Sequence, residues 1–327
     1  MTIKKVAQEA GVSTATVSRV LNNTGVVQDE TREKILRAID KLGYKPSTRQ
    51  QIRSSNVTPL KHRNIALIWT GYSNAAFSET GQKMVLGILK NLQPLGANLT
   101  VDHITIPDRI PHCLAEGKID GILLHGPEPS PLICARLKQF PTVWLLQSGS
   151  EQFGDHVQPD HNLVGQLSSQ YLMGQGCKQL CCISYTPTRN GSSYWQSRAV
   201  GFETYTKIHG INSSVLHCSE EQENPKKEDR AKELVDAFEK MNPRPDGLFV
   251  ANDLGNLIHS ELMRRDITPM TDIPMIAGNT SVTPKPVDIN FFSEEIGQLA
   301  VEALLWRIKN PSMPIITHSV RPELILP

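Results

Sequence analysis

The stretch that most constrains the fold is residues 2–22, TIKKVAQEAGVSTATVSRVLN. Its first half repeats apolar residues at i, i+3, i+4 and i+7, which is one face of a helix. These residues are Ile3, Val6, Ala7 and Ala10. Thr2 occupies the N-cap position, Gly11 follows where a helix ends in a left-handed residue, and Ser13 can cap a second helix. The spacing predicts two short helices joined by a tight turn.

The second helix of this pair has a small, polar outer face. Its inward residues are Val17, Val20 and Leu21. Its outer residues are Thr14, Ala15, Ser18, Arg19 and Asn22. Hydroxyls suit phosphate oxygens and an arginine suits a guanine edge, so this face fits a DNA groove. An ordinary helical hairpin is the alternative, but the spacing, the turn glycine and the polar face together favour a helix-turn-helix.

A third helix is predicted to begin at Gln28 or Asp29 and to end before Gly43. Its apolar stripe is Ile35, Ala38, Ile39 and Leu42. Three short helices in about 45 residues can share one small core, which is typical of a DNA-binding headpiece.

Residues 2–46 resemble the headpiece of the lactose/galactose repressor family of bacterial regulators, almost without interruption. The resemblance implies that the second helix enters the major groove of a palindromic operator. It implies base contacts from Thr14, Ala15 and Arg19. It implies phosphate contacts from Thr2, Ser13, Thr16, Ser18, Asn22 and Thr31.

Residues 47–63, STRQQIRSSNVTPLKHR, are polar and basic, which indicates a linker. In the resembled family this region is a hinge helix that enters the minor groove and inserts a leucine. The family pattern has Asn, Ala and Leu where this chain has Ser47, Gln50 and Arg53. Ile52 is the apolar candidate for insertion, one place out of register, and Arg49 and Arg53 can instead enter a narrow minor groove.

From Asn64 onward short apolar runs alternate with amphipathic segments, which predicts an α/β body with parallel sheets covered on both faces. The predicted strands are 64–69, 97–101, 121–125, 142–146, 179–184, 213–217, 247–251, 274–278 and 288–292. The predicted helices are 78–95, 112–116, 131–139, 162–175, 194–208, 228–241, 253–265 and 293–309.

The body also resembles the family, through VQPDHNLVG, SRAVGF, VANDLG and the terminal RPELI. The resemblance implies two doubly wound parallel-sheet lobes of the periplasmic-binding-protein-like kind. The N-lobe is expected at about 64–159 and 291–319, and the C-lobe at about 160–290 and 320–327. Ligands of such folds lie in a cleft at the carboxyl ends of strands.

Arg198, in SRAVGF, matches a family arginine that binds the effector, and a guanidinium suits sugar hydroxyls or a phosphate. A solvated helix arginine is the alternative. Asn252 ends a strand, and its amide suits a diol, although a helix cap accounts for it equally. Thr70 and Tyr72 follow the first strand of the body, and Trp195 offers an apolar platform or a core residue.

Two positions depart from the family pattern. Thr280 stands where an aspartate is common, so Asn279 or Thr280 must substitute, and Gln147 stands near another common acidic position. Two missing carboxylates indicate a negatively charged effector, an altered effector or a cleft that binds poorly.

Net charge is unevenly distributed. Residues 1–63 carry 12 Lys and Arg against 5 Asp and Glu, so +7, and the remainder carries 22 against 28, so −6. A basic head on an acidic body suits a nucleic-acid anchor joined to a domain that binds elsewhere. With no long apolar run and no leader peptide, we expect a cytoplasmic chain without a membrane partner.

No catalytic or cofactor motif is recognisable. The six cysteines form no CxxC pair, the ten histidines show no metal-binding spacing, and no phosphate loop or nucleophile elbow occurs. We therefore expect no enzyme, no cofactor and no metal, and buried thiols.

The sequence predicts a DNA-binding transcription regulator, a repressor of carbohydrate-utilisation genes controlled by a sugar-type effector. The segment GILLHGPEPSP resembles galactoside-operon regulators of the family. The chain ends at LILP, before any leucine-heptad extension, so a homodimer is expected. A cytoplasmic sugar-binding protein, or a regulator that has lost its effector response, are the alternatives.

Overall fold

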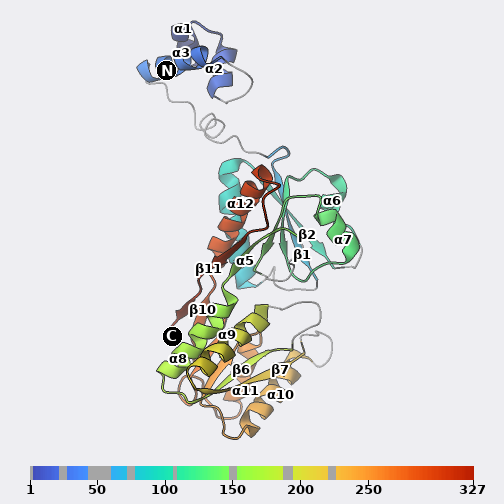
Figure 1. Cartoon of the computed structure of the whole chain (residues 1–327), viewed down its shortest axis with the longest axis vertical. Coiled ribbons are helices and arrows are strands. Elements are labelled where there is room, and N and C mark those ends of the chain that lie inside the picture. The colour runs from blue at the N-terminus through green and yellow to red at the C-terminus, as the bar shows by residue number, and fades with distance from the viewer. Residues whose placement is uncertain are drawn as a thin grey trace. The chain divides into compact units, whose positions relative to one another are not determined.

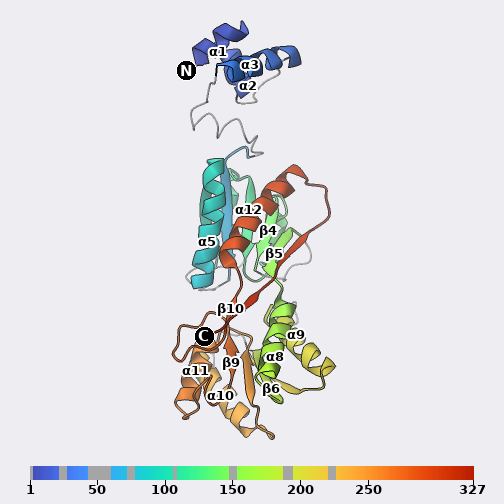
Figure 2. The same ribbon diagram turned by 90° about the vertical axis from the view of Figure 1, so that its left-hand side faces the viewer.

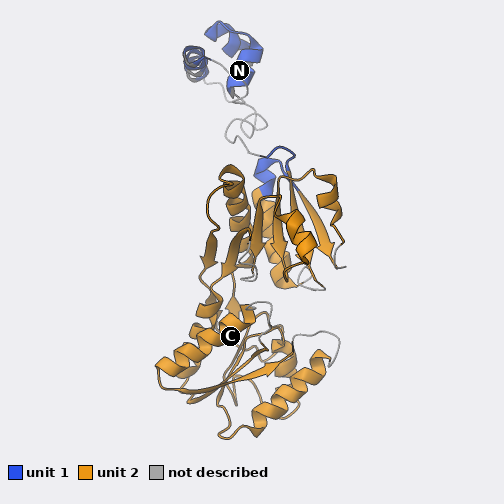
Figure 3. Ribbon diagram, turned by 45° about the vertical axis from the view of Figure 1, so that its right-hand side comes forward, with its two compact units in different colours: residues 1–63, 92–98 blue, residues 64–91, 99–327 orange. Residues whose placement is uncertain are grey.

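The computed structural model describes residues 3–21, 28–42, 60–71, 78–105, 109–146, 153–186, 194–219 and 226–327. The chain forms two compact units, residues 1–63 with 92–98, and residues 64–91 with 99–327 (Figure 3). Some predicted site residues lie outside the described residues. They are Thr2, Asn22, Arg49, Ile52, Arg53, Tyr72 and Gln147.

The first unit contains the three helices predicted from the apolar spacing: α1 (Ile3–Ala10), α2 (Thr14–Leu21) and α3 (Asp29–Lys41). Their shared core is made of Val6, Ala7, Val17, Val20, Ile35 and Ala38. Gly11 adopts a left-handed φ of 66°, and the Val12 amide donates to the Ala7 carbonyl at 3.0 Å. The turn is therefore closed by its own backbone, which confirms the predicted helix-turn-helix.

The N-lobe of the second unit is built on a six-stranded sheet of order β11-β5-β4-β3-β1-β2. Its strands are β1 (Asn64–Thr70), β2 (Asn98–Ile104), β3 (Gly121–His125), β4 (Thr142–Leu145), β5 (Asp155–Pro159) and β11 (Thr317–Val320). The pairings of β3 with β1 and β4, and of β5 with β4 and β11, are parallel. Helices α5 (Glu79–Leu92) and α12 (Ser293–Lys309) cover one face, and α6 (His112–Glu116) and α7 (Pro131–Leu137) cover the other (Figure 1). A 3₁₀ turn, η2 (Gln93–Leu95), follows α5.

The C-lobe is built on a four-stranded parallel sheet of order β7-β6-β8-β9. Its strands are β6 (Gln179–Tyr185), β7 (Asn212–Cys218), β8 (Gly247–Val250) and β9 (Met275–Ala277). Its helices are α8 (His161–Gly174), α9 (Tyr194–Ile208), α10 (Lys227–Lys240) and α11 (Gly255–Met263). A separate antiparallel pair joins β10 (Asp288–Asn290) to β12 (Glu323–Ile325). The predicted fold class, an all-α headpiece on an α/β body of parallel sheets, is confirmed.

Strand β5 was not among the predicted strands, because its sequence, DHVQP, is polar. Asp155 is nevertheless only 1 % exposed, and Arg307 of α12 holds its carboxylate with two hydrogen bonds of 2.8 and 2.5 Å. The Ile316 amide donates to the same carboxylate at 2.8 Å. One buried ion pair therefore joins α12, β5 and the segment that leads into β11, and it lets an acidic residue lie inside a sheet.

Glycines set the spacing of one helix pair in each lobe. A Cβ added at Gly165 of α8 would lie 2.0 Å from the carbonyl oxygen of Arg198 in α9. A Cβ added at Gly201 of α9 would lie 2.0 Å from the carbonyl oxygen of Asn162 in α8. In the N-lobe, a Cβ at Gly87 of α5 would lie 1.9 Å from the Glu294 oxygen of α12 (Figure 2). Each pair therefore packs backbone against backbone.

The six cysteines are free thiols, five of them buried and Cys218 half-buried. Within the described part of the chain, no group of three or more acidic, His or Cys side chains is arranged to hold a metal ion. None of the helices in those same ranges is both long and apolar enough to cross a membrane.

Candidate DNA interface and effector cleft

The outer face of α2 carries the residues predicted to contact DNA. Thr14, Ala15 and Arg19 are exposed, and Ser18 is half-buried beside them. At the start of the helix, the Ser13 hydroxyl accepts from the Thr16 amide at 3.1 Å and shares a 2.8 Å hydrogen bond with the Thr16 hydroxyl. Ser13 therefore caps α2, as predicted, and both hydroxyls lie at the N-terminus, where a helix attracts phosphates.

Thr31 lies apart from that face, in the first turn of α3, and it is half-buried. The Glu9 carboxylate of α1 accepts a hydrogen bond from Lys41 of α3 at 2.7 Å, so an exposed ion pair joins α1 to α3 beside their shared apolar core. Burial of α1, α2 and α3 against one another leaves the outer face of α2 without cover inside the headpiece.

Arg198 of α9 lies at the carboxyl edge of the C-lobe sheet. Its side chain is buried, with 6 % exposed, and its Nη1 donates to the Ala251 carbonyl just beyond β8 at 2.8 Å. Its Nε donates to the His161 Nδ1 at 3.3 Å. Burial lowers the pKa of Arg198 to about 10, because both protein acceptors are neutral and water is excluded.

Three aromatic rings surround this guanidinium. Its Cζ lies 4.5 Å from the centre of the Phe291 ring, 4.8 Å from that of Trp195 and 5.4 Å from that of Tyr194. Trp195 also packs against the C-lobe core and meets the Tyr185 ring at 6.0 Å. The predicted platform therefore lies against Arg198, and the rings stabilise the cation through their faces.

His161, which the sequence argument did not select, joins Arg198 to the N-lobe. It is 5 % exposed, and its Nε2 lies 3.1 Å from the carbonyl of Leu146, directly after β4. Because Nδ1 accepts from Arg198, this geometry assigns the neutral tautomer that donates from Nε2. Burial and then the Arg198 charge lower the pKa of His161 to about 3. Its position after Asp160 in VQPDHNLVG was the available signal.

Asn252 is 2 % exposed and its amide is already engaged. The oxygen accepts from the Leu254 amide at 3.2 Å, and the nitrogen lies 3.8 Å from the Cys218 sulfur. Neighbouring Asp253 accepts from Lys227 at 2.5 Å and from the Tyr185 hydroxyl. These contacts engage the Asn252 amide in the turn before α11, but they do not cap the helix, whose N-cap residue is Leu254.

Thr70 ends β1 and is buried. Its hydroxyl donates to the Pro127 carbonyl at 2.6 Å, with the His125 carbonyl at 3.3 Å. The side chain therefore links the end of β1 to the chain that leaves β3, and the hydroxyl proton of Thr70 is donated in that link.

Asn279 and Thr280 follow β9. Asn279 has a left-handed φ of 58°, and its side-chain oxygen accepts from the Thr80 hydroxyl of α5 at 2.9 Å, which links the two lobes. Thr280 is 8 % exposed, and its hydroxyl oxygen has no hydrogen-bond partner among the described residues. The predicted effector residues Arg198, Trp195 and Thr280 thus share one edge of the C-lobe, and Asn279 faces the N-lobe.

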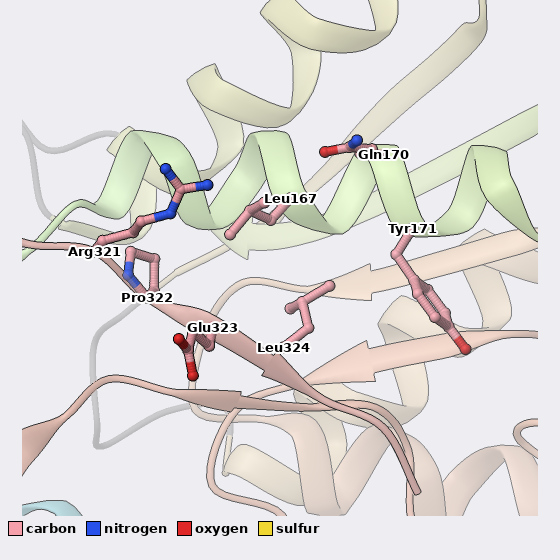
Figure 4. A pocket seen from close by; sticks show the side chains of 7 residues that line it. All are labelled: Leu167, Gln170, Tyr171, Arg321, Pro322, Glu323 and Leu324. Atoms are coloured by element: carbon pink, nitrogen blue, oxygen red, sulfur yellow. The ribbon is translucent and has the colours of Figure 1, made fainter.

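A separate pocket of about 450 Å³ lies between α8 and the chain entering β12 (Figure 4). Its lining residues are Leu167, Gln170, Tyr171, Arg321, Pro322, Glu323 and Leu324. None of the predicted effector residues is among them.

Comparison with known proteins supports both units. A model of bacterial regulatory proteins of the lacI family matches residues 2–47, and a periplasmic binding protein-like domain model matches residues 169–326. The ribose operon repressor of Escherichia coli strain K12 is 27 % identical over 331 residues, covering 95 % of this chain and 94 % of that protein. The HTH-type transcriptional repressor PurR of Vibrio parahaemolyticus is 27 % identical over 347 residues, covering 99 % and 97 %.

Solved structures share the fold. A transcriptional regulator CelR–cellobiose complex has a TM-score of 0.67 at 21 % identity, covering 100 % of this chain and 98 % of that one. The lac repressor dimer bound to operator and the anti-inducer ONPF has a TM-score of 0.63 at 19 % identity, with the same coverage. The related proteins are repressors and not enzymes, as the sequence predicts for this chain. With matches to both its headpiece and its body, the chain belongs to the lactose/galactose repressor family of bacterial transcription regulators.

Proposed function

We propose that this regulator represses carbohydrate-utilisation genes, that it binds a palindromic operator as a homodimer, and that a small sugar-type effector controls it from the cleft between its lobes. We propose the division into a headpiece at 1–46, a hinge at 47–63 and an effector-binding body at 64–327. The observation that carries the proposal is the exposed polar face of α2, held on a compact three-helix core.

The DNA-binding half rests on chemistry that the α2 face offers. Arg19 can donate two hydrogen bonds to one guanine, and Thr14 and Ala15 are small enough to let the helix approach the base edges. The Ser18 hydroxyl and the capped N-terminus of α2 suit the phosphate backbone. The +7 charge of residues 1–63 strengthens binding to every sequence, so affinity should fall steeply with salt.

The effector half rests on Arg198, which is buried at the edge where ligands of such sheets bind. Related proteins regulate the ribose operon or bind cellobiose, which favours a carbohydrate. A regulator bound to the chromosome acts in the cytoplasm, and a palindromic site matches a two-fold dimer. A regulator without effector response is the rival, and thermal shifts across sugars and sugar phosphates would separate the two, because a bound ligand raises the unfolding temperature.

Electrophoretic mobility shift with palindromic DNA tests the DNA-binding half. Arg19→Ala should reduce discrimination between operator and single-base variants by about 1–3 kcal/mol, because a bidentate guanine contact is lost. Ser18→Ala should weaken binding to all sequences alike. Arg37→Ala removes the same charge from α3, where Arg37 binds Glu33, and should leave discrimination unchanged. Purified protein that shifts no palindromic DNA would contradict the proposal.

A further inference from the structure

We infer that the effector is an anion: Arg198 and Thr280 together hold the phosphate or carboxylate of a small hydroxylated molecule at the C-lobe edge of the cleft. The inference rests on the proposed effector control and narrows it to one class of ligand.

The first observation is a buried cation without a counter-charge. Arg198 donates to a carbonyl and to a neutral imidazole, and no carboxylate lies within ion-pair distance among the described residues. A guanidinium taken out of water is costly unless an anion or several acceptors replace the lost hydration. The surrounding rings compensate only part of this cost.

The nearby carboxylates are already used. Asp160 caps α8 by accepting from the Leu163 amide at 2.9 Å. Asp253 binds Lys227 and the Tyr185 hydroxyl. Among the described residues, neither of these carboxylates is therefore left to neutralise Arg198.

The second observation is the unpartnered hydroxyl of Thr280, which is buried yet makes no hydrogen bond among the described residues. Buried hydroxyls rarely lack a partner, so such an atom requires an explanation. A Cβ at Gly255 would lie 3.2 Å from the Thr280 Cγ2, so the methyl group packs toward α11 and the hydroxyl is left for another contact.

Sheet register places Arg198 and Thr280 at the same edge. Val250 of β8 pairs with Ala277 of β9, so Ala251, which Arg198 contacts, and the chain leading to Thr280 leave the sheet side by side. The Phe291 ring, 4.5 Å from the guanidinium, also lies 3.0 Å from a Cβ built at Gly278. An anionic oxygen there can accept from both the guanidinium and the hydroxyl in charge-assisted hydrogen bonds.

Calorimetry and thermal shift on the full chain test this inference, with ribose 5-phosphate and galacturonate as anionic probes and ribose and galactose as neutral ones at one ionic strength. We expect at least one anionic probe to bind at least tenfold more tightly than its neutral partner. Comparing the affinity for ribose 5-phosphate with that for galacturonate identifies whether the site prefers a phosphate or a carboxylate.

Three variants sharpen the test. Thr280→Asp supplies a carboxylate beside Arg198 and should weaken anion binding at least thirtyfold. Thr280→Val, which removes only the hydroxyl, should weaken it about tenfold. The control variant Thr271→Val, at an exposed position, should have no effect on anion binding.

Neutral sugars binding as tightly as their anionic partners would overturn the inference, and so would unchanged anion affinity in Thr280→Asp. Mobility shifts measured in parallel distinguish failure of the anion inference from failure of the proposed effector control. If a neutral sugar alone binds and alters operator binding, effector control stands and the anionic class fails. If operator is bound and no probe of either class binds, both the inference and effector control fail.

Discussion

At the scale of single residues, Arg198 and His161 are the central pair of the proposed effector site. A motif in the sequence selected Arg198, but the lack of a carboxylate partner within the described ranges depends on which side chains surround it in the fold. His161 accepts from the Nε of Arg198 and contacts the Leu146 carbonyl of the N-lobe, so one neutral imidazole connects Arg198 of the C-lobe to the N-lobe.

The depressed pKa of His161 predicts a pH dependence of stability. The pKa is about 3 in the folded state, against about 6.5 unfolded. Between these values the unfolded chain binds the extra proton, so the stabilisation is complete above pH 6.5 and is lost as the pH falls toward 3. The free energy of unfolding, measured by urea denaturation from pH 7.5 down to pH 5, should therefore fall by up to about 1.4 kcal/mol per pH unit from this group, and the urea midpoint should fall with it.

His161→Asn should flatten part of this pH dependence. Burial also lowers the pKa of His125, so a smaller dependence of the same sign should remain in the variant. Identical midpoint curves for the two proteins would show that His161 is accessible to protons in the folded state.

At the scale of elements, paired glycines fix how closely helices pack. Gly165 and Gly201 face the backbone of the opposing helix, so α9 cannot move away from α8 without losing that contact, and α9 carries Arg198. These glycines lie in VQPDHNLVG and SRAVGF, the motifs that the sequence analysis matched to the family. The motifs therefore mark a packing requirement as well as a proposed binding residue.

Two alanine substitutions on α8 and α9 should have opposite effects on stability. Gly201→Ala forces a Cβ to within 2.0 Å of the Asn162 oxygen and should destabilise the body by about 1–3 kcal/mol. Gly174→Ala, at an exposed position with no atom within 4 Å, should stabilise it by up to about 1 kcal/mol. Urea denaturation measures both, and changes of the same sign would contradict the packing argument.

Strand β5 shows where pattern reasoning at this scale reaches its limit. A run of apolar residues, or an alternation of apolar and polar residues, predicts a strand when apolar side chains bury that strand. Asp155 is paired in the interior with Arg307, which follows it by 152 residues. A pattern read over a few neighbouring residues does not include that partner. The other strands of the two lobe sheets, apart from β11, were located from their own short runs of apolar residues.

At the scale of the whole molecule, the chain is divided into two units with separate cores. The boundary at residues 63 and 64 falls at the start of β1, yet Leu60 is buried and the Arg63 carbonyl accepts from the Asn98 amide at 2.7 Å. Residues 60–63 therefore contact the segment at 92–98 that joins α5 to β2.

A fragment of residues 60–327 should fold by itself. We expect the circular dichroism of an α/β protein, one cooperative thermal transition and no shift of operator DNA. A fragment of residues 64–327 lacks Arg63 and Leu60 and should unfold several degrees lower. Failure of the longer fragment to fold would show that the body depends on the headpiece.

The sequence by itself determined the headpiece helices, the alternating strands and helices of the body and the class of protein, because each of these follows from local spacing of apolar, glycine and capping residues. The tertiary structure decided what depends on partners distant in sequence. Asn252 was a binding candidate by type, and the fold shows its amide oxygen accepting from the Leu254 amide in the turn that precedes α11. Thr280 was a departure from the family pattern, and among the described residues its buried hydroxyl has no partner and Arg198 has no carboxylate. Charge compensation and hydrogen-bond saturation depend on three-dimensional neighbours, so only the folded chain reveals them.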